Sequence, residues 1–460
     1  MTESLRSESI ARLEAYIEHV MTQGEAAGLA IAVVDSGGQT LYQCAFGHRD
    51  RDQGLPVDGD TLFGLASVTK SFTALAIMQL CEKGMLKLHD PVCLHMPEFA
   101  HPGVTVEHLL CHNTGLYPQS CKEITQLMAE IGRPEGDPAY DAEICREAAH
   151  GLVETLNRVR DFFGPPGEYF CYSNDCYNLA AALICRVAGF ASFAHYTDAN
   201  ILAPLGMSRS GCGFEWQGGN ISRLYDYRNG VLRGDWSFYD DASPLLGAGI
   251  MKSTLNDMKR YVGMYLNWGR GPQGARLLSG AGIRQMIRPR MPCELNQYYG
   301  LGLTVKPLAD LTVIEHGGNM PGISSRIALS HESGIGVIIL CNTTKVRVSA
   351  ISDLAMLLFS GRGALPYPPP APAPVVWDRG LMEQVCGLYR GEDCSTFRIA
   401  LDGDCFSVNL DGADTTACPV NSYMLAVRTS VLDTPVSILR DDNDRVWALG
   451  HDFHIIPKVE

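Results

Sequence analysis

The chain has 460 residues, of which 46% are hydrophobic and 19% charged, and its formal net charge is −14. These values predict a soluble globular protein with a large core, long enough for one large domain and a small one. The acidic balance argues against a nucleic-acid partner, because no basic patch is available to neutralise phosphates. The longest apolar runs, such as GIGVIILC, have the length of strands, so we expect no membrane partner either. The oligomeric state stays open.

The N-terminal segment carries acidic residues throughout and has no apolar core of the kind found in secretory signals. Its apolar residues have helical spacing and predict an amphipathic helix: Leu5, Ile10, Leu13, Ile17 and Val20. Sixteen cysteines are many, but without an export signal they are interpreted as reduced core residues rather than a disulfide framework. We therefore expect a cytoplasmic protein.

Strand-like and helix-like patterns alternate along the first three quarters of the chain. Residues 28–47 predict a β-hairpin that turns at Ser36-Gly37-Gly38, and an apolar helix begins at Ser67. From about Leu75 to Asp240 the pattern is mostly helical, with one helix from Asn178 to Val187. Three strands follow, at about 311–316, 323–330 and 335–341. Strands on both sides of a helical region indicate one antiparallel sheet formed by distant segments.

A proline-rich segment, LPYPPPAPAPVVW from Leu365 to Trp377, is typical of a stiff spacer. Beyond it, short alternating strands surround a tight Asp402-Gly403 turn and continue nearly to the end of the chain. We therefore expect three parts: a large domain at 1–360, a linker at 361–375, and a small all-β barrel, lipocalin-like in type, at 376–460.

Lys70 follows Ser67 by three residues, so the two side chains lie on one helix face. A serine hydroxyl needs a base, and a lysine with the ordinary pKa of about 10.4 cannot act as one. Burial beside apolar neighbours such as Phe72 would lower that pKa. The alternative is a helix-capping serine beside a solvated lysine. No other lysine of the chain has a serine three residues before it.

Two further short motifs could complete such a site. Tyr172-Ser173-Asn174 lies in a loop just before a helix, where a tyrosine could relay protons and an asparagine amide could orient a carbonyl. Tyr227-Arg228-Asn229 and Tyr265-Leu266-Asn267 have the same pattern in less suitable settings. His316-Gly317-Gly318 ends a predicted strand, where glycines would let a substrate backbone approach. His101-Pro102-Gly103 also fits the H-x-G pattern, but it lies in a loop and precedes Tyr172 in the chain.

Together, the S-x-x-K, Y-x-N and H-x-G motifs, in this order, resemble those of the penicillin-recognising serine hydrolases. The nearest are the class C β-lactamases, with their esterase and D-peptidase relatives. The resemblance covers roughly residues 8–360 and includes the phrases VTVEHLLCHNTGL, GAGIMKSTLNDMKRY and HGGNMPGISS. It implies an α+β fold, in which an antiparallel sheet flanked by helices meets a mostly helical subdomain at the site. The C-terminal part resembles the small barrel appended to some D-aminopeptidases and acyl-transferring relatives.

The resemblance also implies roles for particular residues. Ser67 corresponds to the acylated nucleophile, Lys70 to its proton acceptor and Tyr172 to the proton relay. Asn174 corresponds to a substrate-amide contact. The strand motif corresponds to His316, Gly317 and Gly318, and the backbone N–H groups of Ser67 and Asn319 would form an oxyanion hole.

One position departs from the β-lactamases and many transpeptidases, which have lysine in place of His316. Because histidine is charged only near or below about pH 6.5, the departure favours the esterases and peptidases of the family. A different interpretation of HLLCH, His108 to His112, is a metal site, but a third ligand and the glutamate of H-E-x-x-H are missing. G-x-S-x-G, the motif of α/β-hydrolases, is absent from the sequence.

The sequence therefore predicts a serine hydrolase that cleaves a D-residue-containing peptide or a small ester through an acyl-enzyme, without a metal or organic cofactor. An amine acceptor in place of water would make it an acyltransferase or a cyclising enzyme. A penicillin-binding sensor, a weak β-lactamase or a scaffold with an inactive site are further alternatives.

Overall fold

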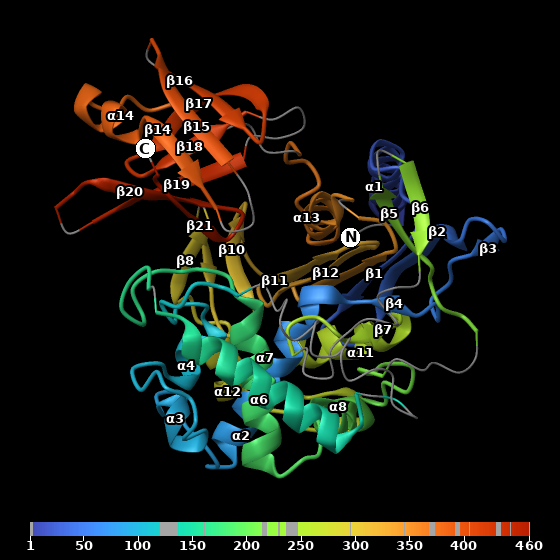
Figure 1. The fold of residues 1–460 in the computed structure, drawn as a ribbon. Helices are drawn as coiled ribbons and strands as arrows, with labels where there is room; N and C mark the ends of the chain where they lie inside the picture. Colours follow the sequence, from blue (N-terminus) through green and yellow to red (C-terminus); the bar gives the residue numbers. More distant parts are fainter. Residues whose placement is uncertain are drawn as a thin grey trace.

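The structure is a computed structural model in which the described residues form two large β-sheets, two small two-stranded sheets and a helical layer (Figure 1). The residues that it describes are 3–119, 137, 139–160, 162–213, 219–228, 231–235, 247–294, 296–344, 346–367, 373–391, 396–403, 405–428, 434–441 and 443–459. No single helix among them is long and apolar enough to cross a membrane. One pair of helices, 174–188 and 193–205, has the length and composition of a span when taken together, but the pair is bent by 70°.

The large sheet has nine strands and joins the two ends of the first domain. In spatial order they are β3 (Leu55–Pro56), β2 (Thr40–Asp50), β1 (Gly28–Asp35), β13 (Ile335–Cys341), β12 (Ile323–Ser330), β11 (Leu311–Met320), β10 (Thr304–Leu308), β9 (Gln297–Tyr299) and β8 (Met291–Glu294). The antiparallel pairing of β1 with β13 places Leu29 opposite Cys341 and Asp35 opposite Ile335. This pairing confirms the prediction that distant segments close one sheet.

The sheet has a core on each face because its central strands are apolar on both sides. Leu29, Ile31 and Val33 of β1 face the predicted N-terminal helix α1 (Glu3–Gln23) and α13 (Val348–Phe359). The alternate residues of β1 face the second core, which includes α11 (Leu255–Leu266) and the helical layer.

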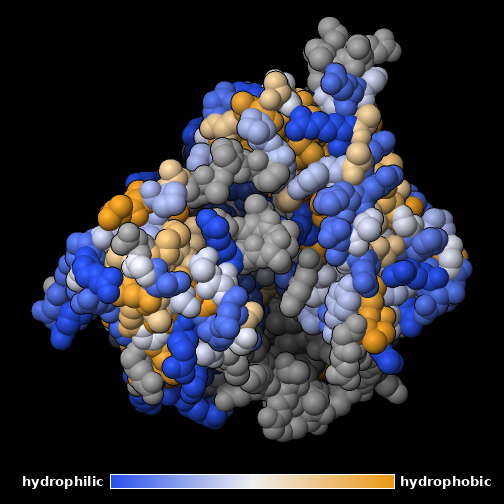
Figure 2. All heavy atoms as spheres, turned by 90° about the horizontal axis from the view of Figure 1, so that it is seen from above, coloured by the Kyte–Doolittle hydropathy of each residue, from blue (hydrophilic) through white to orange (hydrophobic). Residues whose placement is uncertain are grey.

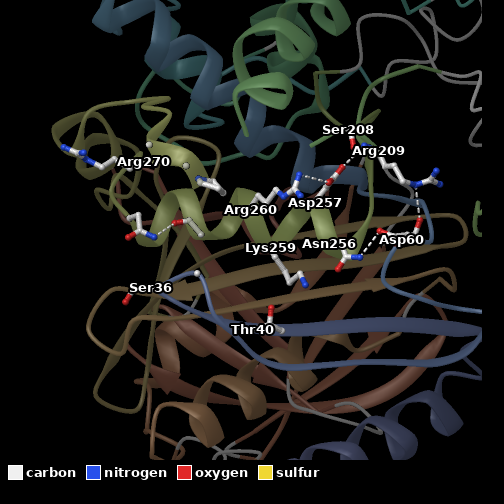
Figure 3. A pocket seen from close by; sticks show the side chains of 17 residues that line it. Ser36, Thr40, Asp60, Ser208, Arg209, Asn256, Asp257, Lys259, Arg260 and Arg270 are labelled. Atoms are coloured by element: carbon white, nitrogen blue, oxygen red, sulfur yellow. Dashed lines mark hydrogen bonds and ion pairs between the residues drawn. The ribbon is translucent and has the colours of Figure 1, made fainter. Parts of the chain in front are cut away.

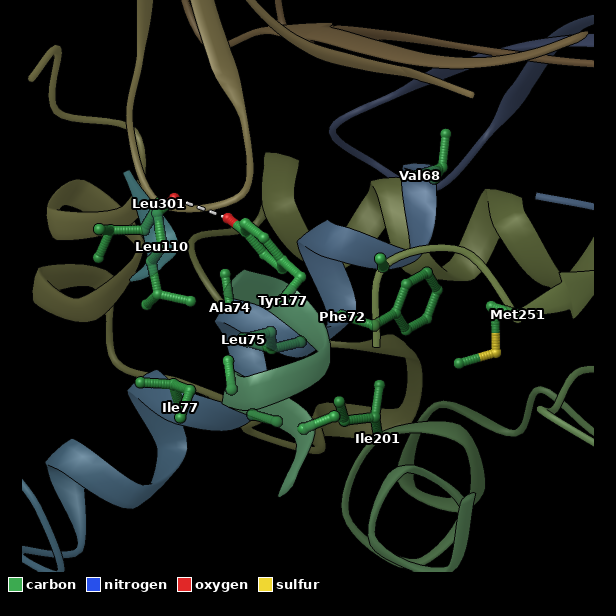
Figure 4. Packing of buried hydrophobic residues seen from close by; sticks show 14 of the residues in the cluster. Val68, Phe72, Ala74, Leu75, Ile77, Leu110, Tyr177, Ile201, Met251 and Leu301 are labelled. Carbon is green, nitrogen blue, oxygen red and sulfur yellow. Dashed lines mark hydrogen bonds between the residues drawn. The ribbon is translucent and has the colours of Figure 1, made fainter. Parts of the chain in front are cut away.

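The helical layer is built around α2 (Thr69–Glu82) and α7 (Asn174–Ala188), which pack against each other (Figure 4). The other helices in this part of the chain are α3 (Val92–His95), α4 (Val106–Leu110), α6 (Ala142–Arg158), α8 (Phe193–Thr197), η2 (Asp198–Leu202), α9 (Ala203–Leu205) and α12 (Gly280–Met286). Twelve consecutive residues of α2, from Thr69 to Leu80, are buried, so this helix lies inside the core.

The prediction of helices and polar loops up to Asp240 is wrong in one place. Strands β5 (Leu224–Arg228) and β6 (Val231–Asp235) pair as a hairpin. The sequence between them is Asn229-Gly230, a dipeptide that favours hairpin turns, and this local preference outweighs the helical context. Residues 236–246, the second half of the aromatic-rich segment Tyr225 to Pro244, lie outside the described residues.

The C-terminal sheet is a nearly closed barrel of eight antiparallel strands. They are β14 (Gly387–Arg390), β15 (Thr396–Asp402), β16 (Cys405–Leu410), β17 (Ala413–Asn421), β18 (Met424–Val427), β19 (Thr434–Arg440), β20 (Val446–His451) and β21 (His454–Pro457). A bridge between Tyr389 and Lys458 brings the last strand to the first, and α14 (Arg379–Val385) packs at one end. Asp402 pairs with Cys405, which confirms the tight turn predicted there.

The predicted linker, 361–375, falls partly on residues 368–372, which lie outside the described chain. At its end, the Val375 amide already donates to Pro419 O at 2.8 Å, so this residue is attached to the barrel. The barrel packs on the first domain through an apolar cluster that includes Phe163 and Cys171 on one side and Ala448 and Ile455 on the other. Seen from above, hydrophilic side chains are spread over the surface and hydrophobic ones form small groups (Figure 2).

Candidate active site

Ser67 lies in η1 (Ala66–Val68), a single 3₁₀ turn directly before α2. It is partly exposed, whereas its neighbours Ala66 and Val68 are fully buried. Ala66 has a φ of +45°, a left-handed conformation that is costly for a residue other than glycine and is concentrated at functional sites. The turn therefore presents one hydroxyl from an otherwise buried segment.

Lys70 is completely buried, and three polar atoms in the described part of the chain contact its Nζ atom. They are Ser67 Oγ at 3.1 Å, Asn174 Oδ1 at 2.7 Å and the Ala248 carbonyl oxygen at 2.9 Å. The side chain of Ser67 caps neither η1 nor α2. The alternative of a capping serine beside a solvated lysine is therefore wrong.

The contacts of Lys70 determine the role of each hydrogen-bonding position on its Nζ atom. Asn174 Oδ1 and Ala248 O are acceptors only, so each takes one N–H of the amine. In the ammonium form the third N–H donates to Ser67 Oγ, and in the neutral amine the two acceptors leave the lone pair for that oxygen. This arrangement lets Lys70 accept the hydroxyl proton of Ser67 without moving.

Tyr172 completes the group around Ser67. Lys70 Nζ lies 4.6 Å from the centre of its ring. Burial raises the pKa of the Tyr172 phenol, a hydrogen bond with Ser67 lowers it, and the negative charge of Asp452 raises it again. The phenol is therefore a neutral group beside the serine, where it can pass a proton on.

His316 lies on β11 and is joined to the Tyr172 loop by a buried chain of hydrogen bonds. The Ser173 amide donates to His112 Nδ1 at 3.0 Å, and His112 Nε2 lies 3.3 Å from the Tyr299 hydroxyl. That hydroxyl lies 2.9 Å from His316 Nε2, and His316 Nδ1 lies 2.6 Å from Gly317 O. Since an amide only donates and a carbonyl only accepts, each ring has its tautomer fixed.

The two histidines are held neutral. Burial, followed by the positive charge of Lys70, lowers the pKa of His316 to about 3. The same two causes, in the same order, hold the pKa of His112 well below its ordinary value. His316, the position at which the sequence departs from lysine, therefore carries no positive charge at neutral pH.

Gly317 and Gly318, which follow His316, differ in what a side chain at each position would meet. A Cβ atom on Gly318 would lie 2.1 Å from Leu65 O and 2.3 Å from Ser325 Oγ, so only glycine lets β11 approach the turn that holds Ser67. A Cβ atom on Gly317 would meet only the Arg326 guanidinium, at 2.9 Å. Asn319 follows in the same strand, and β11 contacts η1.

One pocket opens beside these elements, and a larger one lies elsewhere. One, of about 560 Å³, is lined by Asn319 and its neighbours together with Asp226 and Tyr227 of β5. It therefore opens beside the strand end that the sequence assigned to the site. The other, of about 850 Å³, lies between α11 and the β1–β2 turn, away from Ser67, and is lined by polar residues such as Lys259 and Asn256 (Figure 3).

The residues of the other segments that match a motif make different contacts elsewhere in the fold. Tyr265 is buried in α11, with its hydroxyl 3.4 Å from Ser71 O. His101 is buried against Leu156 O. In HLLCH, His108 forms the capping box of α4 with Thr105, while His112 lies beside Tyr172. No group of three or more His, Cys, Asp or Glu side chains in the described ranges could hold a metal ion.

Several residues of the site were missed in the sequence. Ala248 contributes only a carbonyl, which no side-chain pattern signals. His112 lies in one of the family phrases, and the sequence favoured a packed helix-to-loop segment there over a metal site, so its place beside Tyr172 was not expected. Tyr299 and Phe453, whose carbonyl accepts the Tyr172 amide at 2.9 Å, come from distant parts of the chain.

A serine, a buried lysine and a tyrosine at the junction of an antiparallel sheet and a helical layer are the arrangement of a serine β-lactamase-type fold. The family model described as Beta-lactamase matches residues 13–358, about three quarters of the chain, and the protein belongs to this family.

Individual relatives agree with this assignment. Esterase EstB of Burkholderia gladioli is 34% identical over 213 residues, which are 44% of this chain and 51% of the esterase, so the match spans about half of that relative. The octameric penicillin-binding protein homologue from Pyrococcus abyssi superposes with a TM-score of 0.67 at 25% identity, covering 98% of this chain and 100% of that one. SurE solved with D-Leu has a TM-score of 0.70 at 20% identity over the full length of both chains, which shows a shared fold.

Proposed function

We propose that the protein is a serine hydrolase that cleaves an ester or amide bond through an acyl-enzyme on Ser67. The observation that carries the proposal is the contact of Lys70 Nζ with Ser67 Oγ, combined with two carbonyl acceptors that occupy the other positions of the amine. This is a nucleophile with a positioned base, held in a buried setting.

In the first half of the reaction, Ser67 Oγ attacks the substrate carbonyl carbon and its proton passes to Lys70. Tyr172, in contact with the same serine, delivers a proton to the leaving alcohol or amine. The negative oxygen of the tetrahedral intermediate would be bound by the backbone N–H groups of Ser67 and Asn319. In the second half, water attacks the acyl group, and Lys70 and Tyr172 move the protons in the reverse direction.

The proposed substrates are small esters and peptides with a D-residue. The 34% identity with an esterase and the fold shared with a penicillin-binding protein homologue support these two classes. The neutral His316 supports an ester or amide over a substrate whose recognition needs a positive charge at this position.

A second candidate is acyl transfer, in which an amine of a peptide replaces water as acceptor. The pocket beside Asn319 supports it, because it could hold an acceptor or a second part of the substrate. A penicillin-binding sensor, acylated without turnover, is the third.

The experiment compares a chromogenic ester, a D-alanyl peptide and a chromogenic β-lactam, each with wild type and Ser67→Ala, and with and without an added amine. Steady hydrolysis that is lost in Ser67→Ala supports the hydrolase. An amide product formed from the amine supports the transferase, and a single burst without turnover supports the sensor. Full activity of Ser67→Ala contradicts the proposal.

A further inference from the structure

The segment from Cys171 to Ser173 is held along both of its edges. On one edge, the Cys171 amide donates to His112 O at 2.8 Å and the Ser173 amide donates to His112 Nδ1 at 3.0 Å. On the other edge, the Tyr172 amide donates to Phe453 O at 2.9 Å. All three successive amides are therefore fixed, and the middle one is fixed by the C-terminal barrel.

The side chain of Phe453 also packs on Tyr172. Their ring centres are 5.9 Å apart with the planes 27° from parallel, and the His112 ring lies 4.2 Å from the same tyrosine. Phe453 makes a second contact, edge to face, with Phe170 at 5.9 Å. The His454 ring of the barrel lies edge to face with Tyr172 at 6.4 Å, so the phenol beside Ser67 lies between the His112 ring and two rings of the barrel, of which Phe453 is the nearer.

The backbone of Phe453 is strained. Phe453 has a φ of +68° and Asp452 a φ of +46°, in the two-residue turn between β20 and β21. Such turns favour Asn-Gly because both positions need a left-handed backbone. A phenylalanine at the second position is less favourable than glycine, and strain of this kind is retained where it serves a site.

We infer that Phe453 is a positioning residue for Tyr172, so that the C-terminal barrel supplies part of the machinery that moves protons at Ser67. The inference rests on the proposed function, because it assumes that Tyr172 takes part in the reaction. It assigns the barrel a role in the chemical step itself, through one carbonyl and one aromatic ring.

The test uses the full chain with Phe453→Gly, which removes the ring and relieves the backbone strain. The matched control is Trp268→Gly, since Trp268 is another large aromatic residue with positive φ, at +52°, and it stacks on His331. Phe453→Tyr restores an aromatic ring. The readouts are kcat and KM for a chromogenic ester, the rate at which a fluorophosphonate labels Ser67, and Tm.

In Phe453→Gly, kcat should fall by about tenfold or more while KM changes by less than about threefold, because Tyr172 is no longer held in the position from which it moves protons in the transition state. The labelling rate should fall in parallel, and Tm should not decrease. Phe453→Tyr should restore kcat to within about threefold, and Trp268→Gly should leave it within about twofold. If Phe453→Gly does not fold, Phe453→Leu, which keeps the bulk without the ring, replaces it with the same expected loss.

Unchanged kcat and labelling in Phe453→Gly, in an enzyme whose Ser67 is labelled, would overturn this inference alone. An equal loss in Phe453→Gly and Trp268→Gly would also overturn it. Wild-type protein that is not labelled at Ser67 would overturn the proposed function, and this inference with it.

Discussion

The Nζ atom of Lys70 lies 3.1 Å from the Oγ atom of Ser67, and Lys70 is buried completely. One 3₁₀ turn followed by the first turn of α2 brings the two side chains together, so the contact follows from local structure. The carbonyls of Asn174 and Ala248 then direct the amine, since each takes one of its N–H groups. The mechanism proposed above depends on this directed contact.

Replacement of Lys70 by methionine tests the base directly. Lys70→Met keeps the length and apolar stem but cannot accept a proton, so kcat should fall by about 10²- to 10⁴-fold. The matched control is Lys252→Met, because Lys252 is also fully buried and donates to Gly213 O at 2.8 Å, on a different element. Kinetics normalised to folded protein should show wild-type kcat for the control. Equal losses in both variants would contradict a specific role for Lys70.

Replacement of Asn174 by aspartate tests how the amine is held. A carboxylate 2.7 Å from Lys70 Nζ stabilises the ammonium form, which has no lone pair for the serine proton. The acid limb of the kcat/KM profile should therefore move to higher pH in Asn174→Asp, and activity at pH 7 should fall by about tenfold or more. An unshifted profile would show that Asn174 does not control the amine.

The two glycines of the strand motif should differ in their tolerance of a methyl group. In Gly318→Ala, the new Cβ meets backbone at 2.1 Å, so β11 must move away from Ser67. We expect a loss of about 1–3 kcal/mol in the free energy of unfolding, together with lower kcat. In Gly317→Ala, the Cβ meets the tip of Arg326, which can shift, so the effect should be smaller. Denaturant unfolding and ester kinetics compare the two, and the reverse order would be evidence against this packing.

Acid should destabilise the protein through His316 and His112. The pKa of His316 is about 3 in the folded state, while an unfolded histidine titrates near 6.5. Between these values only the unfolded state binds the proton, so stability is complete above about pH 6.5 and is lost as pH falls toward 3. For His316, the expected loss from pH 7 to pH 5 is about 2 kcal/mol.

The measurement is urea unfolding at pH 7 and at pH 5 for wild type and His316→Gln. Glutamine does not titrate, so the difference between the two pH values should be smaller in the variant by about this amount. His112 remains in the variant and accounts for part of the residual dependence, because burial lowers its pKa too. A pH dependence identical to that of wild type would indicate that folding does not lower the pKa of His316.

The sequence was sufficient for the features that depend on local order. The Ser67–Lys70 pair lies within four residues, and the apolar strands that became β1 and β13 could only be buried in a sheet. The pairing of β5 with β6 was also within reach, because the sequence between them, Asn229-Gly230, is a dipeptide that favours hairpins, but the helical context was given more weight.

The remaining parts of the site depend on contacts between distant segments. The Tyr172 amide meets Phe453 O only because the barrel packs on the loop before α7, and no periodicity records that packing. His112 bonds to Tyr299, 187 residues further along the chain. The turn between β20 and β21 has the sequence Asp452-Phe453, although Asn-Gly adopts its left-handed backbone more readily. This was the one local sign in the sequence that the hairpin has a special position.

The most direct test of the central claim is covalent labelling. Wild-type protein is treated with a fluorophosphonate and digested, and the modified residue is located by mass spectrometry; Ser67→Ala and Lys70→Met are treated in parallel. We predict one phosphonylated residue, Ser67, with no label in Ser67→Ala and labelling slowed by about 10²-fold or more in Lys70→Met. A label on another residue, or labelling of Lys70→Met at the wild-type rate, would contradict a serine activated by this lysine.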